Sequence, residues 1–337
     1  MNMDKLQELF EKLDEAVTLL QKELDVSYIE ALAETIQNLS YEGKAQQMDG
    51  LPSDEVIAQL NRMYRKLNLA EEERELVRKL VQIGFIKAIR EDKIQSNHQI
   101  TPDTIAFLLA YFIDAIKANK EETIHLHDLA AGSGNLLFVV MDYLNKRGNP
   151  VTAEAVDNDD LLVTLAANSA HLQQWDDQVK FTHSDSLQEL LIEPADVAVS
   201  DLPVGFYPVE ERSKKFETAF AEGHPYAHFL MLEQHMKYLK EGGWGFFIVP
   251  KNLFESDETG ILMKWLKKTG YLQGMLHLPE NLFQSAQAQK SILMIQKAGA
   301  GAKQAEQVLL GTIPALKDAR KIQDFIKEFH NWSTLML

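Results

Sequence analysis

From Ile124 onward the chain alternates short apolar runs with segments of helical periodicity, and this alternation constrains the fold more than any other feature. The first four apolar runs are separated by stretches long enough for a crossover helix. Such spacing predicts a mainly parallel sheet with helices on both faces, and ligands of such sheets bind beyond the carboxyl ends of the strands. The seven predicted strands read TIHLHDLA, TAEAVD, VKFTHSD, DVAVSDL, GWGFFIVP, LQGMLHLP and KSILMIQK.

The segment before this sheet, up to about Gln95, predicts a series of helices. A second helix is expected from Tyr28 to about Gln47, and Ser53 suits the N-cap position of a third. A fourth spans 70–91, with its acids early and its bases late, as the helix dipole favours. We therefore expect a helical N-terminal domain over residues 1–95, a bundle suited to docking or packing. The first helix carries one apolar stripe, formed by Leu6, Leu9, Phe10, Leu13, Val17 and Leu20.

The tail that follows the last predicted strand opens with the small, flexible stretch AGAGAKQA. It then contains a strand-like segment, VLLGTI, and a helical one, DARKIQDFIKEFHNW. We expect residues 299–337 to form a C-terminal extension that packs on the core. No internal repeat and no extended low-complexity segment interrupts this organisation.

Composition excludes several classes of protein. With 337 residues, 45% of them hydrophobic, the chain can bury a sizeable core. The absence of cysteine excludes disulfides, thiolate zinc sites and a cysteine nucleophile. No apolar run approaches the roughly 20 residues that span a bilayer, and the start MNMDKLQELFEKLDE lacks the features of a signal peptide. We expect a cytoplasmic protein with no membrane partner and no metal site.

The formal net charge of −16 opposes nonspecific attraction to nucleic acid. A polyanion would therefore bind through a local basic patch or through a basic partner. Acidic residues surround each basic cluster of the sequence, as is typical of solvated faces. The clusters are Arg62, Arg65 and Lys66, then Lys87, Arg90 and Lys93, and then Arg212, Lys214 and Lys215.

The stretch HDLAAGSGNLLF brings Gly132 and Gly134 to the end of the first predicted strand. Glycine there lets the backbone approach a ligand closely. No Gly-Lys-Ser/Thr follows, and the third glycine of the dinucleotide fingerprint is missing. Asp157 ends the second strand, where an acid can accept hydrogen bonds from a ribose diol, and Asp185 follows the third, facing an adenine edge. The series predicts a pocket for an adenosine-containing ligand without a pyrophosphate.

This ordered series resembles the class I S-adenosylmethionine-dependent methyltransferases, and among them the adenine-N6 DNA methylase-like group. The resemblance covers Ser96 to Lys297. QITPDTIAFLL resembles the group's Thr-Pro segment, DLAAGSGNLLF its Asp-Pro-x-x-Gly-x-Gly loop with Leu129 in place of the proline, and the helix after Asp157 carries the group's late Asn168. Over its whole length the chain resembles uncharacterised methyltransferase-like proteins of Gram-positive bacteria.

The resemblance implies an α/β fold: a Rossmann-like seven-stranded methyltransferase core over residues 96–298, with the last pair of strands antiparallel, behind the helical N-terminal domain. It implies S-adenosyl-L-methionine as the cofactor. The residues that it assigns to the cofactor are Thr101, Asp128, Ala130, Gly132, Gly134, Asn135, Asp157, Asn158, Asp185 and Ser186.

The group's catalytic signature, Asn/Asp-Pro-Pro-aromatic, corresponds here to SDLPVGFYP. An exocyclic amine is a poor nucleophile, and two acceptors that hold its hydrogens favour a tetrahedral, reactive nitrogen. Asp201 supplies the first acceptor and the Leu202 carbonyl, before Pro203, the second. Leu202 replaces the first proline, and Val204 stands where the aromatic ring stacks on the extracted base. Phe206 or Tyr207 takes over that contact, or both pack against the core; the sequence leaves these alternatives open.

Three functions follow as hypotheses. The first is an N-methyltransferase acting on an amino nitrogen of nucleic acid, adenine N6-like, with Asp201 orienting the amine and Phe206 beside it. The second is a methyltransferase acting on a protein amide or amine. The third is a catalytically silent S-adenosylmethionine-binding protein that works through its helical domain. Because the core has no separate target-recognition region, a nucleic-acid substrate would require specificity from the helical domain or from a partner subunit.

Overall fold

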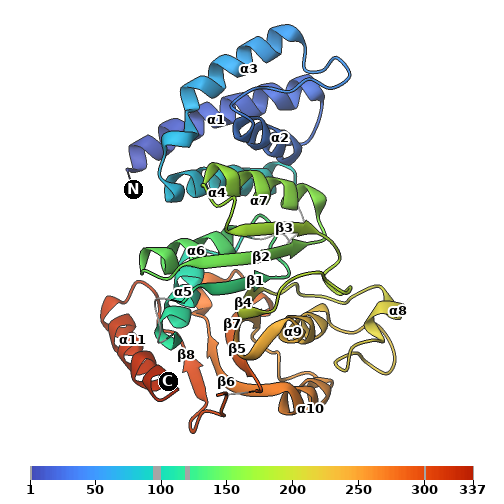
Figure 1. The fold of residues 1–337 in the computed structure, drawn as a ribbon, viewed down its shortest axis with the longest axis vertical. Helices are drawn as coiled ribbons and strands as arrows, with labels where there is room; N and C mark the ends of the chain where they lie inside the picture. The colour runs from blue at the N-terminus through green and yellow to red at the C-terminus, as the bar shows by residue number, and fades with distance from the viewer. Residues whose placement is uncertain (1, 94–99, 118–121, 300, 337) are drawn as a thin grey trace. The chain divides into compact units, whose positions relative to one another are not determined.

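The computed structural model describes residues 2–93, 100–117, 122–299 and 301–336. It is an α/β protein whose eight strands form one sheet in the order β3-β2-β1-β4-β5-β7-β6-β8 (Figure 1). The chain separates into two compact units. Unit 1 comprises residues 1–101, 132–138 and 157–183, and unit 2 comprises residues 102–131, 139–156 and 184–337. The expected boundary at residue 95 lies outside the described residues.

Unit 1 is mainly helical. The apolar stripe of α1 packs with α2 and α4 into one core, which also takes in Leu162, Leu165 and Leu172 of α7. The unit therefore joins the N-terminal helices to the helix that follows Asp157. Its elements are α1 (Met3–Leu24), α2 (Tyr28–Ser40), α3 (Asp54–Leu67), η1 (Leu69–Glu71), α4 (Arg74–Glu91), α7 (Asp160–Leu172) and β3 (Val179–His183).

The second helix is shorter than the sequence predicts. Ser27 and Glu30 form a reciprocal capping box at its start. It ends at Ser40 rather than near Gln47, because Glu42 and Gly43 adopt positive φ angles of 58° and 63° that no α-helix continues through. Ser53 does occupy the N-cap position of α3, but its side chain makes no capping hydrogen bond there.

The strands of unit 2 match the predicted runs. The first part of the sheet is parallel, because β1 pairs with β2 and β4, and β4 pairs with β5. Strand β7 runs antiparallel to both β5 and β6, which confirms the expected antiparallel pair. These strands are β1 (Ile124–Asp128), β2 (Val151–Asp157), β4 (Ala195–Asp201), β5 (Leu239–Pro250), β6 (Gly270–His277) and β7 (Lys290–Lys297).

The tail adds the eighth strand. The predicted VLLGTI segment forms β8 (Leu309–Thr312), which pairs in parallel with β6. The sheet thus has one strand more than the seven expected, because the backbone groups at the free edge of β6 take a further partner. The predicted tail helix is α11 (Ala319–Thr334).

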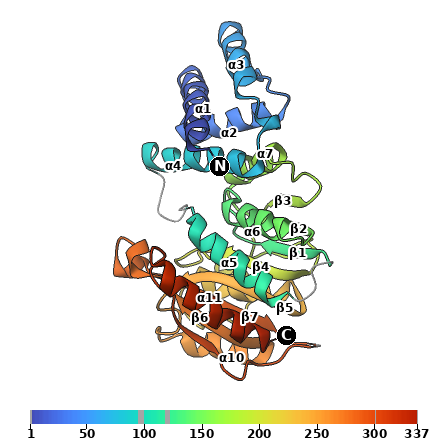
Figure 2. The same cartoon turned by 90° about the vertical axis from the view of Figure 1, so that its left-hand side faces the viewer.

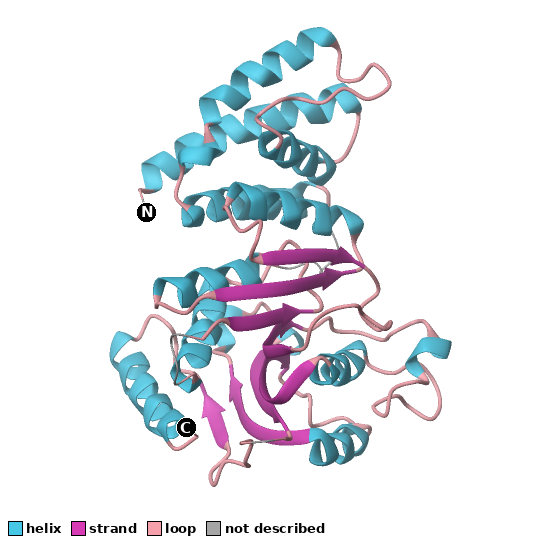
Figure 3. Ribbon diagram, in the orientation of Figure 1, coloured by secondary structure: helices cyan, strands magenta, loops and turns pink. Residues whose placement is uncertain are grey.

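Helices cover both faces of the sheet in unit 2 (Figures 2 and 3). On one face, α9 (Ala227–Lys237) and α10 (Thr259–Thr269) pack on β5 and β6. On the other face, α5 (Asp103–Ile116) lies beside α11, where the rings of Phe112 and Phe329 stack at 4.1 Å. The remaining helices are α6 (Asn135–Lys146) and α8 (Glu210–Ser213), with the short η3 (Glu280–Leu282) and η4 (Ala286–Ala288). Within the described ranges, no helix is long and apolar enough to cross a membrane.

Candidate active site

The two glycines of the turn after β1 have different structural roles. Both adopt positive φ, +52° at Gly132 and +77° at Gly134, which is the region that favours glycine. A Cβ added at Gly132 would meet no atom within 4 Å, whereas one at Gly134 would lie 2.7 Å from the ring of Phe138. Gly132 therefore presents bare backbone to open space, and Gly134 makes room for a buried ring at the start of α6.

Asp157 is hydrogen-bonded to this turn within unit 1. Its carboxylate accepts hydrogen bonds from the backbone N–H of Gly132 at 2.7 Å and of Asp159 at 3.0 Å. Burial raises the pKa of Asp157, and those two donors oppose the rise. A carboxylate has about four acceptor positions, so it retains capacity for further donors such as ribose hydroxyls. The neighbouring Asn158 is exposed.

The first residue of α6 is held by the helical part of unit 1. Arg78 of α4 is 2% exposed and donates to the side-chain oxygen of Asn135 at 2.7 Å. Asn135 in turn donates to the backbone carbonyl of Thr101 at 3.2 Å. The carboxylate of Glu75 accepts two further hydrogen bonds from the same guanidinium. Sequence reasoning missed Arg78, because an acid and a base three residues apart are common on exposed helix faces.

In unit 2, two of the candidate residues hold the backbone at the end of β1 and directly after it. Asp128 is buried and accepts from the N–H of Ala130 at 3.0 Å and from the hydroxyl of Ser200 at 2.7 Å. The hydroxyl of Ser186 donates to the carbonyl of Leu129 at 2.5 Å. These bonds join the carboxyl ends of β1 and β4 to the segment after β3.

Asp185 belongs to a polar cluster of unit 2. Its carboxylate accepts from the hydroxyl of Tyr207 at 2.6 Å, from the N–H of Leu187 at 2.9 Å, and from the guanidinium of Arg212. Burial, and after it the hydrogen bond to Asp185, raises the pKa of Tyr207 to about 12. Arg212 is thus paired with an internal carboxylate, so this member of the third basic cluster is not a purely solvated charge.

The catalytic candidate Asp201 stands at the carboxyl end of β4. The N–H of Leu202 donates to the carbonyl of Ile248 at 3.0 Å, which continues the pairing with β5, and the Leu202 side chain is buried. Lys290, the first residue of β7, donates to Oδ1 of Asp201 at 2.6 Å. Sequence reasoning missed this lysine, because a charged residue at the start of an apolar strand is an ordinary feature.

The two aromatic residues that follow Asp201, Phe206 and Tyr207, lie in different environments. Phe206 is 63% exposed, and its ring stacks on Tyr226 at 5.1 Å, which stacks in turn on His228 at 5.2 Å. A backbone bridge between Phe206 and Tyr226 holds the pair together. The ring of Tyr207 instead packs against the hydrophobic core of unit 2, and its hydroxyl donates to Asp185. Of the two alternatives to an aromatic at Val204, only Phe206 presents an open ring face.

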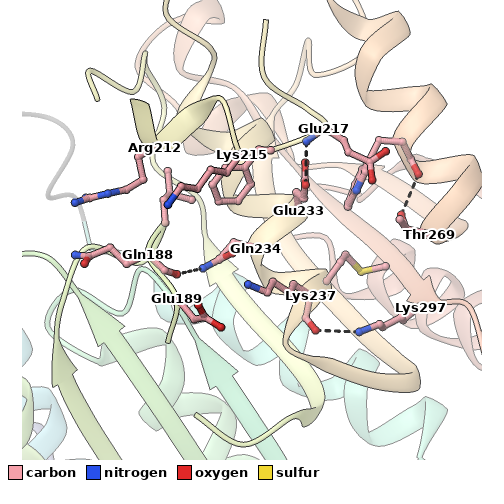
Figure 4. Close-up of a pocket in the computed structure, with 14 residues that line it drawn as sticks. Gln188, Glu189, Arg212, Lys215, Glu217, Glu233, Gln234, Lys237, Thr269 and Lys297 are labelled. Atoms are coloured by element: carbon pink, nitrogen blue, oxygen red, sulfur yellow. Dashed lines mark hydrogen bonds between the residues drawn. The ribbon is translucent and has the colours of Figure 1, made fainter. Parts of the chain in front are cut away.

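A cavity of about 610 Å³ lies in unit 2 between α9, the end of α10 and the segment at 187–189 (Figure 4). Its polar groups mostly bond to one another: Gln234 donates to the carbonyl of Gln188, and Lys297 donates to that of Lys237. Burial lowers the pKa of Lys297. Side chains of both charge signs line the cavity, among them Arg212, and the sequence indicated nothing of its shape.

Comparison with known proteins gives consistent matches over nearly the whole chain. The N-6 DNA methylase family matches residues 86–329, and the YtxK N-terminal helical domain matches residues 7–89. The uncharacterised protein YtxK of Bacillus subtilis is 36% identical over 332 residues, with 98% of each chain covered.

Solved structures give the same result. A candidate class I S-adenosylmethionine-dependent methyltransferase from Listeria monocytogenes is 39% identical, with a TM-score of 0.90 over 98% of this chain and 100% of that chain. A type I restriction-modification methyltransferase subunit from Streptococcus thermophilus, 16% identical, shares the fold with a TM-score of 0.66 over 94% of this chain and 74% of that chain.

Proposed function

Because the chain belongs to the N-6 DNA methylase family of S-adenosylmethionine-dependent methyltransferases, we propose that it methylates an amino nitrogen of a nucleic-acid base, with Asp201 orienting that nitrogen. The observation that carries the proposal is the pairing of two features on one short segment. A carboxylate ends β4, and an exposed, stacked aromatic follows it five residues later at Phe206.

The residues of the glycine turn fit the cofactor of the family. S-adenosylmethionine, when bound, supplies a methyl group on a positively charged sulfur. The open backbone at Gly132 would accommodate the methionine part, and Asp157, already fixed by two N–H donors, would accept the ribose hydroxyls. In unit 2, Asp185 and Ser186 would border the adenine, with Asp185 accepting one more hydrogen bond beside those from Tyr207, Arg212 and the N–H of Leu187.

Asp201 and the carbonyl of Leu202 would then act on the substrate amine. Each accepts one N–H of the amino group, which draws the nitrogen out of conjugation with the ring and directs its lone pair. The proton leaves to water after the methyl group has been accepted. The reaction therefore requires no general base with a shifted pKa, and the main contribution of this chain is positional.

Phe206 would replace the stacking aromatic that Val204 cannot provide. A base stacked on an aromatic ring gains about 1–3 kcal/mol. The stack of Phe206 on Tyr226 and of Tyr226 on His228 holds the receiving ring in one orientation, so little entropy is lost when a base adds to it. Gly205, at a φ of +136°, lets the backbone turn sharply before this ring.

Specificity for a nucleic-acid site would come from outside the core. At a net charge of −16 the chain attracts no polyanion in general. In unit 1, Arg62, Arg65 and Lys66 of α3 are exposed, whereas Lys87 is already paired with Asp14. We propose that α3 or a basic partner subunit supplies the contacts to phosphate.

The test is transfer of a labelled methyl group from S-adenosylmethionine into DNA, RNA and protein fractions of a strain that lacks the gene. Label is expected in a nucleic-acid fraction with the wild type and not with Asp201→Ala. Asp196→Ala is the matched control, because Asp196 is the second residue of the same strand and is likewise paired with a lysine, Lys240 at 3.0 Å. Label in protein alone would contradict the proposal, and tight cofactor binding with no transfer to any fraction would replace it with the silent alternative.

A further inference from the structure

The ion pair between Lys290 and Asp201 joins two strands that are not neighbours. Asp201 pairs in register with Ile248 of β5, and Ile248 pairs with Ile292 of β7. Lys290 begins β7 opposite Pro250, so its side chain reaches across the end of β5 to the carboxylate. Both side chains are largely covered, at 25% exposure for Lys290 and 19% for Asp201.

The ammonium of Lys290 makes the same contact that a substrate amine needs. Its Nζ donates to Oδ1 of Asp201 at 2.6 Å, the distance of a charge-assisted hydrogen bond. A neutral amine is a weaker donor than an ammonium, so it competes poorly for that oxygen. Positive charge also develops on the nitrogen that accepts a methyl group, and a fixed cation beside it opposes this charge. The ion pair therefore favours the resting protein over the reacting complex.

A second ion pair on the same strand provides an internal comparison. Asp196 at the amino end of β4 pairs with Lys240 at the start of β5, at 3.0 Å. Strand ends of the opposite polarity thus carry matching lysine–aspartate pairs, but only the pair at the carboxyl end includes the residue proposed to hold the amine. The effect of removing a lysine charge alone can be measured at Lys240, and the effect of removing the ion pair of Asp201 at Lys290.

We propose, on the basis of the proposed function, that Lys290 is a specificity-determining residue. In the free protein Lys290 is paired with Asp201, and when nucleic acid binds it leaves Asp201 and pairs with a phosphate of the substrate. A nucleic acid carries phosphates close to the base being methylated, so it offers the displaced ammonium a new anionic partner. A nucleoside or a protein amide offers none. When the substrate has no phosphate, Lys290 stays bound to Asp201 and hinders binding of the amine. The exchange therefore favours polyanionic substrates at the reacting centre of an otherwise acidic protein.

The experiment compares the wild type with Lys290→Met, Lys290→Arg and Lys240→Met. It measures kcat/KM on an oligonucleotide that the wild type methylates and on the free nucleoside of the same base, and the salt dependence of oligonucleotide binding. Lys290→Met is expected to lower kcat/KM on the oligonucleotide and to raise it on the nucleoside, by about five-fold each, the equivalent of an ion pair of about 1 kcal/mol. The slope of log K against log salt should become shallower by about 0.7–0.9, one phosphate contact.

The other variants separate this role from a structural one. Lys290→Arg retains a cation and should keep the wild-type slope and the preference for the oligonucleotide, and Lys240→Met should leave both unchanged. Equal losses on both substrates with an unchanged slope in Lys290→Met would overturn the inference and leave the proposed function standing. Absence of nucleic-acid methylation by the wild type itself would overturn the proposed function, and this inference with it.

Discussion

Alanine should mainly impair cofactor binding at Gly132 and mainly impair stability at Gly134. Gly132→Ala places a methyl group into open space, and its cost in unfolding free energy is about 1–2 kcal/mol for a left-handed φ. Gly134→Ala has the same backbone cost, and its Cβ would also lie 2.7 and 2.9 Å from two ring carbons of Phe138. Phe138 is 1% exposed and has no room to withdraw, so overpacking adds about 1–3 kcal/mol.

Urea unfolding and calorimetric titration with S-adenosylmethionine measure the two effects separately. Gly132→Ala should remain folded and lose most of its cofactor affinity, because the new methyl group occupies the face that the ligand approaches. Gly134→Ala should show the larger drop in stability, by about 2–5 kcal/mol in total. Wild-type affinity in Gly132→Ala would refute the assignment of that face to the cofactor. Wild-type stability in Gly134→Ala would refute the steric argument.

Three further predictions concern charge and stacking. Asp157→Asn should weaken cofactor binding. The cofactor affinity of the wild type should be constant at neutral pH and should fall as the pH drops through the raised pKa of Asp157. Binding titrations at several pH values should show that this fall is absent in the variant. Burial lowers the pKa of His127 to about 3, so below about pH 6.5 the unfolded chain binds a proton that the folded chain does not. The free energy of unfolding should therefore decrease from pH 6.5 downward, by about 2 kcal/mol at pH 5 for His127 alone. His127→Leu should flatten this pH dependence in urea titrations. The stacked His235 has its pKa lowered by burial too and should account for the slope that remains in the variant, and an equal slope in wild type and variant would count against the contribution of His127. Phe206→Ala should raise KM for a nucleic-acid substrate about 5- to 150-fold without altering S-adenosylmethionine affinity, whereas an unchanged KM would exclude Phe206 as the stacking ring.

The sequence predicted the features that depend on neighbours along the chain. Every strand candidate from TIHLHDLA to KSILMIQK is a strand, because alternation and apolar runs are local signals. The glycines fall where predicted, between β1 and α6, and both adopt the positive φ angles that glycine tolerates without strain. The tail strand was also visible, but its place at the edge of β6 was not, since pairing partners are chosen in three dimensions.

The contacts that define the candidate site could not be predicted in this way. Arg78 and Asn135 are separated by 57 residues, and Asp201 and Lys290 by 89. No local pattern distinguishes either base from a solvated one. The packing of α7 with the N-terminal helices was unpredicted for the same reason: Leu162, Leu165 and Leu172 look like the apolar face of any crossover helix.

The position of the transferred methyl group shows whether Asp201 directs methylation to an amino nitrogen of a base. Nucleic acid from a strain lacking the gene is incubated with the protein and S-adenosylmethionine, digested to nucleosides, and examined by mass spectrometry. We expect a new methyl group on an exocyclic amino nitrogen, present with the wild type and with Asp196→Ala and absent with Asp201→Ala. A methyl group on a ring carbon, a ring nitrogen or a ribose oxygen, or one that Asp201→Ala still transfers, would contradict it.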